Sequence, residues 1–221
     1  MSDTKQLTFA LVSGRLTLVP VVLAAVIGFV RFRQLPNNLR YLAGLAWFEL
    51  PLEVAGLLII FQHGNNLFLM PIYIVGELGL LVLIYQHTLH SATFTKTAQW
   101  LIVGFAIYVA FDSLVSAPGL SSYRPGQQVV QSVFILGLVG LYFRKLLNEL
   151  WVMSLTREPM FWVSVGLSIY FLGYLQIALF SDYMLRHYSL QTNRNIWSVQ
   201  NVLHILLHSC YCLALWMRPA K

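Results

Sequence analysis

Long apolar runs, separated by short polar segments, dominate the hydrophobic and polar pattern of this sequence. A helix needs about 20 mainly apolar residues to cross a bilayer. Runs of about that length occur seven times, with Gly, Pro, Asn and Gln gathered in the gaps between them. The pattern predicts an all-α integral membrane protein, a seven-transmembrane-helix bundle that forms a single domain over residues 1–221. The predicted helices cover about residues 7–30, 38–61, 66–85, 98–116, 128–143, 159–180 and 196–216.

Composition supports this prediction. Of the 221 residues, 58% are hydrophobic and 10% are charged, and the mean hydropathy is +0.69. A soluble domain carries about 25% charged residues, so this chain lacks the polar side chains to cover a water-facing surface. The first run is too long, and its flanks too weakly basic, for a cleaved signal peptide. None of the gaps is long enough to hold a soluble catalytic or DNA-binding domain. The lipid bilayer is therefore the predicted partner, and nucleic acid is not.

The net charge of +6 comes from basic residues in short clusters between the apolar runs. This arrangement is typical of a membrane topology signal, in which Lys and Arg accumulate on the cytoplasmic side. The predicted topology places nine Lys and Arg on one side and five on the other. We therefore expect the N-terminus outside and the C-terminus in the cytoplasm. The nine are Arg31, Arg33, Arg40, Lys96, Arg144, Lys145, Arg157, Arg218 and Lys221, and the five are Lys5, Arg15, Arg124, Arg186 and Arg194.

Ionisable side chains inside the predicted spans are the candidate functional residues. Each such group near the bilayer centre costs at least about 2.5–3.5 kcal/mol, so it should have a partner or a role. At about 1.5 Å per residue, most of them lie in one layer, slightly outside the midplane. Helical spacing also places Tyr73 on the face of Glu77, and Asn201 on the face of His204. We therefore predict an outward-opening polar pocket among the spans 7–30, 38–61, 66–85 and 196–216. Its predicted ligand-binding residues are Arg15, Glu49, Glu53, Tyr73, Glu77, Asn201 and His204.

Three carboxylates against one arginine leave an excess of negative charge in this layer. Protonated carboxyls, a histidine proton, a metal ion or a cationic ligand could each compensate for it. A purely structural role is also open, in which Arg15 pairs with Glu53 or Glu77 and the histidines form hydrogen bonds between helices.

Zinc is the alternative cofactor, with His204, His208, Glu49 and Glu53 as metal ligands, since two histidines four apart on a helix can bind zinc. The H-x3-H spacing on the last span resembles the intramembrane hydrolases that include alkaline ceramidases and adiponectin receptors. The resemblance is confined to these two histidines. That superfamily also has an early serine and histidine and aspartates on the next helix, whereas here the second predicted span offers Glu49 and Glu53 and no early span has a buried histidine. We expect no catalytic residues and no cofactor if the zinc alternative fails.

Three segments carry a broader resemblance: "NNLFLMPIYIVGELGLLVLIYQ", "EPMFWVSVGLSIYFLGYL" and "WSVQNVLHILLHSCYCLALW". They resemble an uncharacterised family of bacterial seven-helix membrane proteins, often encoded near sensor histidine kinases. The family's motif residues match Asn65, Asn66, Tyr73, Glu77, Phe161 and Trp162. The resemblance implies a bacterial inner membrane location and a sensing role with a separate partner such as a histidine kinase.

Three functions are therefore open from the sequence. The first is a sensor or receptor-like input module with a pocket for an unknown small-molecule ligand. The second is a metal-dependent intramembrane hydrolase. The third is a transporter of a small solute or cation.

Overall fold

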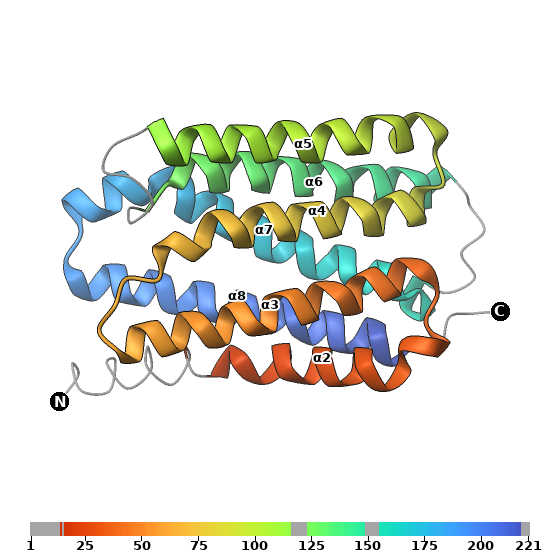
Figure 1. The fold of residues 1–221 in the computed structure, drawn as a ribbon, viewed down its shortest axis with the longest axis horizontal. Helices are drawn as coiled ribbons and strands as arrows, with labels where there is room; N and C mark the ends of the chain where they lie inside the picture. Colours follow the sequence, from red (N-terminus) through yellow and green to blue (C-terminus); the bar gives the residue numbers. More distant parts are fainter. Residues whose placement is uncertain (1–13, 15, 116–122, 149–154, 218–221) are drawn as a thin grey trace.

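A computed structural model describes residues 14, 16–115, 123–148 and 155–217. Every regular element in these residues is a helix, and no strand occurs among them. Seven α-helices run back and forth along the long axis of the molecule (Figure 1). They are α2 (Leu18–Arg31), α3 (Asn37–Phe61), α4 (Met70–Leu89), α5 (Ala92–Val115), α6 (Pro125–Asn148), α7 (Pro159–His187) and α8 (Leu190–Trp216). Three short 3-10 helices connect them: η1 (Phe32–Gln34), η2 (Leu67–Leu69) and η3 (Leu155–Arg157).

Six of these helices, α3 to α8, are long and apolar enough to cross a membrane. The chain is therefore a multi-pass membrane protein, as the pattern predicts. Helix α2 has 14 residues, which span about 21 Å, less than the hydrocarbon core of about 30 Å. Most of the first half of the predicted first span lies outside the described residues, so the count of seven spans stays a prediction.

Several helices extend past the predicted span boundaries. The predicted 128–143 is the shortest span, but α6 has 24 residues and begins at Pro125. Helix α8 begins at Leu190, where the Ser189 side chain accepts a hydrogen bond from the backbone N–H of Thr192. A hydropathy pattern ends at the first polar residues, whereas a helical backbone continues to a cap or a proline.

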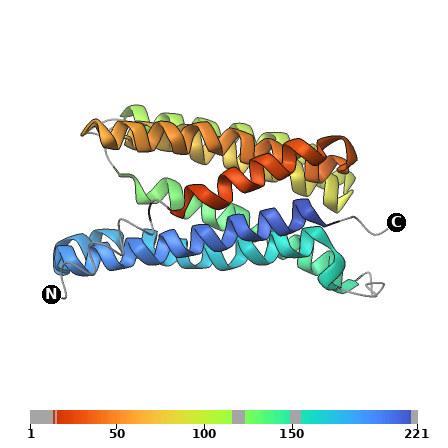
Figure 2. The same cartoon turned by 90° about the horizontal axis from the view of Figure 1, so that it is seen from below.

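Six helices form a closed ring in the order α2, α3, α4, α6, α7 and α8, with α8 packing again on α2. Figure 2 shows α3 and α4 on one side of the bundle and α7 and α8 on the other, with α2 and α6 between them. Helix α5 lies outside this ring and packs against α4. The ring therefore encloses an interior that every one of its helices can line.

Close packing of small residues brings neighbouring helices of the ring together. A Cβ atom added to Gly28 of α2 would lie 2.8 Å from Ala43 Cβ of α3. A Cβ atom added to Gly166 of α7 would lie 2.9 Å from Cys210 Cβ of α8. Small residues allow this approach, which gives membrane helices their van der Waals contact.

The outer surface is apolar, as expected of a surface in contact with lipid. Phe29, Trp100, Leu114 and Trp216 are each at least two-thirds exposed although they are large and hydrophobic. Patches of this kind are rare on soluble monomers. The polar side chains gather inside the bundle instead, and they form the candidate site.

Candidate ligand-binding site

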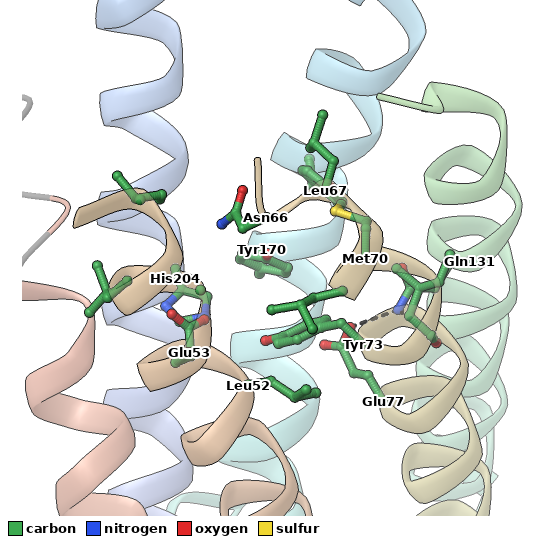
Figure 3. A pocket seen from close by; sticks show the side chains of 16 residues that line it. Leu52, Glu53, Asn66, Leu67, Met70, Tyr73, Glu77, Gln131, Tyr170 and His204 are labelled. Carbon is green, nitrogen blue, oxygen red and sulfur yellow. Dashed lines mark hydrogen bonds and ion pairs between the residues drawn. The ribbon is translucent and has the colours of Figure 1, made fainter. Parts of the chain in front are cut away.

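A cavity of about 310 Å³ lies inside the ring (Figure 3). It extends from Glu77 toward the end of the bundle at which α3 connects to α4. Five helices and η2 contribute side chains to it, among them helices far apart in the sequence. The lining residues are Leu52, Glu53, Gly56, Leu57, Ile60, Asn66, Leu67, Leu69, Met70, Tyr73, Ile74, Glu77, Gln131, Tyr170, Tyr174 and His204.

Helical periodicity explains which side chains reach the cavity. On α3, the lining residues Gly56, Leu57 and Ile60 follow Glu53 by three, four and seven positions. On α4, Met70, Tyr73, Ile74 and Glu77 follow the same spacings. Residues at these spacings share one face of a helix. One stripe of each helix therefore faces the cavity and brings a carboxylate with it.

Glu77 is held by a helix that the predicted pocket does not include. It is 4% exposed, and its Oε2 accepts a hydrogen bond of 2.7 Å from Nε2 of Gln131 on α6. The same amide group lies 3.4 Å from the carbonyl oxygen of Ile74. A buried carboxyl group needs such donors. Gln131 therefore fixes the position of Glu77 at the base of the cavity.

Glu53 and His204 lie beside each other within the lining. The distance between His204 Nε2 and Glu53 Oε1 is 3.5 Å. His204 is 9% exposed, and neither ring nitrogen forms a hydrogen bond with a described residue. The ring of Tyr170 meets the ring of His204 edge-on, with 6.0 Å between centroids, and stacks on Tyr174 at 5.7 Å. An acidic group, an imidazole and aromatic rings thus converge from α3, α7 and α8.

A second pair, Glu49 and His208, lies behind the cavity. Both residues are fully buried, and His208 Nε2 is 2.9 Å from Glu49 Oε2. His208 Nδ1 is 3.1 Å from the carbonyl oxygen of His204, an atom that can only accept, so Nδ1 carries a proton. The contact with Glu49 then needs one further proton, on either the imidazole or the carboxyl. The pair is electrically neutral in both arrangements.

The structure brings together part of the predicted ligand-binding set. Glu53, Tyr73, Glu77 and His204 line one cavity. Glu49 lies one helical turn from Glu53 and faces His208 instead. Asn201 is not among the lining residues, and its Nδ2 lies 3.7 Å from the position of a Cβ atom added to Gly14. Arg15 lies outside the described residues.

Sequence reasoning missed Gln131, Tyr170 and Tyr174. The signal for Gln131 was present, because Gln127, Gln128 and Gln131 form a polar stripe at helical spacing within an apolar run. The two tyrosines gave no comparable signal, because aromatic residues four apart on a membrane helix are typical of the helix packing core.

The four predicted zinc ligands come together as two pairs, Glu49 with His208 and Glu53 with His204. Among residues 14, 16–115, 123–148 and 155–217, no group of three or more His, Cys, Asp or Glu side chains has an arrangement that could hold a metal ion. Zinc binding therefore stays a prediction from the H-x3-H spacing.

Asp112 of α5 has structural partners on α6 and just before it. Its Oδ2 lies 3.2 Å from Arg124 Nη1 and accepts a hydrogen bond of 2.7 Å from Gln127 Nε2. These contacts tie α5 to the start of α6, away from the cavity.

Comparison of the chain with family models, curated proteins and solved structures found no match. The fold and the site therefore define the class of protein: a multi-pass membrane protein with a polar cavity inside its helix bundle.

Proposed function

We propose that this chain is a receptor-like input module of the bacterial inner membrane, which binds a small molecule in its cavity and signals through a separate partner. The observation that carries the proposal is the cavity, since four of its polar lining residues come from three different helices and meet in one place. A cavity of about 310 Å³, lined by apolar and polar side chains together, has the size of a small-molecule site.

The distribution of charge supports an outward-facing cavity. Seven described basic residues lie at the end of the bundle opposite the α3–α4 connection: Arg31, Arg33, Arg40, Lys96, Arg144, Lys145 and Arg157. Three lie at the cavity's end: Arg124, Arg186 and Arg194. The positive-inside rule places the end with more basic residues in the cytoplasm. Ligand would then enter from outside.

The basic cytoplasmic end would be the contact surface for the signalling partner. The resemblance to bacterial seven-helix proteins encoded near sensor histidine kinases suggests the class of that partner. Within the sensing role, ligand binding would change the packing of α3 and α4 around the cavity. Helix α3 begins at the basic face and α4 ends there.

A screen for thermal stabilisation by small molecules tests the proposal. Gly56 lines the cavity, and a Cβ atom there would have only Asn66 Nδ2, at 3.3 Å, within 4 Å. Gly56→Leu should therefore fill the cavity. Gly44→Leu on the same helix is the matched control, since nothing lies within 4 Å of a Cβ atom there. We expect compounds that stabilise the wild type and the control but not Gly56→Leu. Compounds that stabilise all three equally would contradict the proposed site.

The signalling role needs a second measurement. If a sensor histidine kinase is encoded beside this gene, that kinase, reconstituted with the chain in vesicles, should change its rate of autophosphorylation when a stabilising compound is added. The Gly56→Leu variant should abolish that response. A rate that never depends on the compound would leave a ligand-binding protein without the proposed signalling role.

A metal-dependent enzyme is the second candidate, because the rings of His204 and His208 lie 4.2 Å apart and each ring lies beside a glutamate. Nδ1 of His208 faces a backbone carbonyl, an arrangement that orients metal-binding imidazoles in other proteins. Elemental analysis of protein purified without chelator tests this candidate. Near-stoichiometric zinc that is lost in His208→Ala would favour the metal-dependent enzyme over the receptor-like module.

A further inference from the structure

The lining of the cavity carries acidic groups. Two carboxyl groups, those of Glu53 and Glu77, lie in its lining, and no Lys or Arg is among the described lining residues. Glu49 does not add to this count, because it forms a neutral pair with His208 behind the cavity. A carboxylate in a low-dielectric interior needs an opposite charge, a proton or strong hydrogen-bond donors.

A buried imidazole adds a hydrogen-bonding group to this space. Gln131 directs its amide donor at Glu77, so that donor is already used. His204 is buried to more than nine-tenths, it lines the cavity, and neither of its nitrogens has a hydrogen bond with a described residue. A neutral imidazole offers one nitrogen as an acceptor. A ligand with N–H groups and a positive charge would satisfy both Glu53 and His204.

The aromatic residues favour the same chemistry. Tyr170 and Tyr174 stack on each other at the cavity wall, and Tyr73 lies above Glu77 on α4 (Figure 3). The face of an aromatic ring attracts a cation, and the attraction is larger where water is excluded.

We propose that the ligand of this cavity is a protonated amine, a small organic cation whose N–H groups donate to Glu53 and His204 while Glu77 supplies a second carboxyl acceptor. This inference rests on the proposed function, because it requires that the cavity is a ligand site. It specifies what the site recognises: one positive charge with N–H donors, on a body small enough for about 310 Å³.

Arg15 does not compensate both carboxyl groups, even if it pairs with one of them as the sequence predicts. One guanidinium compensates one carboxylate, and the second remains. A carboxyl group therefore remains available for the amine with or without that ion pair.

Matched pairs of amines and alcohols test the proposal. The pairs are butylamine and butanol, diaminobutane and butanediol, and phenethylamine and phenethyl alcohol. Each compound is titrated against the full-length protein in detergent, with thermal stability and calorimetry as readouts. In at least one pair the amine should bind about tenfold or more tightly than the alcohol, because a hydrogen bond to a charged group contributes that much. Glu53→Gln should remove most of this preference.

Glu158→Gln is the matched control, since Glu158 precedes α7 at the opposite end of the bundle. It should leave the preference for the amine unchanged. Equal binding of amine and alcohol in every pair, with no effect of Glu53→Gln, would overturn the amine proposal and leave the cavity as a site for neutral ligands. Binding that is unaffected by Gly56→Leu would instead show that the cavity is not the site, and the proposed function would fall with it.

Discussion

Removing either partner of the buried Glu49–His208 pair should destabilise the protein far more than removing an ordinary hydrogen bond. Both side chains are fully buried, and their contact of 2.9 Å joins α3 to α8 across the ring. Glu49→Leu leaves an imidazole without its partner in an apolar interior, and His208→Leu leaves a carboxyl group in the same state. Breaking one side of a buried ion pair costs about 3–5 kcal/mol.

The double variant decides the nature of the interaction. Glu49→Leu combined with His208→Leu removes both polar groups, so it should cost less than the sum of the two single changes. Interhelical hydrogen bonds in membrane proteins give coupling energies of about 0.6 kcal/mol on average. For a pair that shares one proton between an imidazole and a carboxyl group, the coupling energy should exceed about 2 kcal/mol.

Unfolding in mixed micelles of a mild detergent and SDS provides the assay. The control is Tyr85→Phe, which removes a hydrogen bond of 2.8 Å between the buried hydroxyls of Tyr85 and Ser164. Loss of this hydrogen bond between neutral groups should lower the free energy of unfolding by about 1 kcal/mol. Single changes at Glu49 and His208 that each cost no more than the control, together with strict additivity in the double variant, would refute the assigned pairing.

Further predictions concern topology, charge and packing. A reporter at the C-terminus should be cytoplasmic and one in the α5–α6 connection external, as protease accessibility in spheroplasts can check; the reverse would mean an inward-facing cavity. Arg15→Met should destabilise the protein in detergent, and adding Glu53→Gln or Glu77→Gln should recover part of the loss; additivity in both would exclude the predicted ion pair. Gly28→Ala should cost about 1–3 kcal/mol in the same unfolding assay, because its Cβ would lie 2.8 Å from Ala43 Cβ. Gly104→Ala, with nothing within 4 Å, should be neutral or stabilise by up to about 1 kcal/mol, and equal effects at both glycines would contradict the packing argument.

The helices and part of the candidate site were predictable from the sequence. Span length follows from the bilayer, so apolar runs of about 20 residues locate α3 to α8, with boundaries that differ by up to seven residues from those of the helices. The depth of each residue along its helix and the face that it occupies predict Glu53, Glu77 and His204 in one layer, and these three residues line one cavity. Both arguments depend only on the geometry of single helices.

The remaining site residues depend on which helices are neighbours, and this order is not contained in the pattern of any one helix. Helix α6 packs between α4 and α7, which brings Gln131 to Glu77. Glu49 shares a face with Glu53, yet the position of α8 turns it toward His208 and away from the cavity. A rotation of one helix about its own axis by less than half a turn would change which of its side chains face the cavity. Side-chain packing across the ring determines that rotation.

Native mass spectrometry of the protein, purified from its own membrane without chelator, tests the central claim most directly. The account predicts a bound small organic molecule with a basic nitrogen, present in the wild type and in Gly44→Leu and lost in Gly56→Leu. Bound zinc in near-stoichiometric amount, retained in Gly56→Leu and lost in His208→Ala, would contradict the account and make the cluster of Glu49, Glu53, His204 and His208 a metal centre.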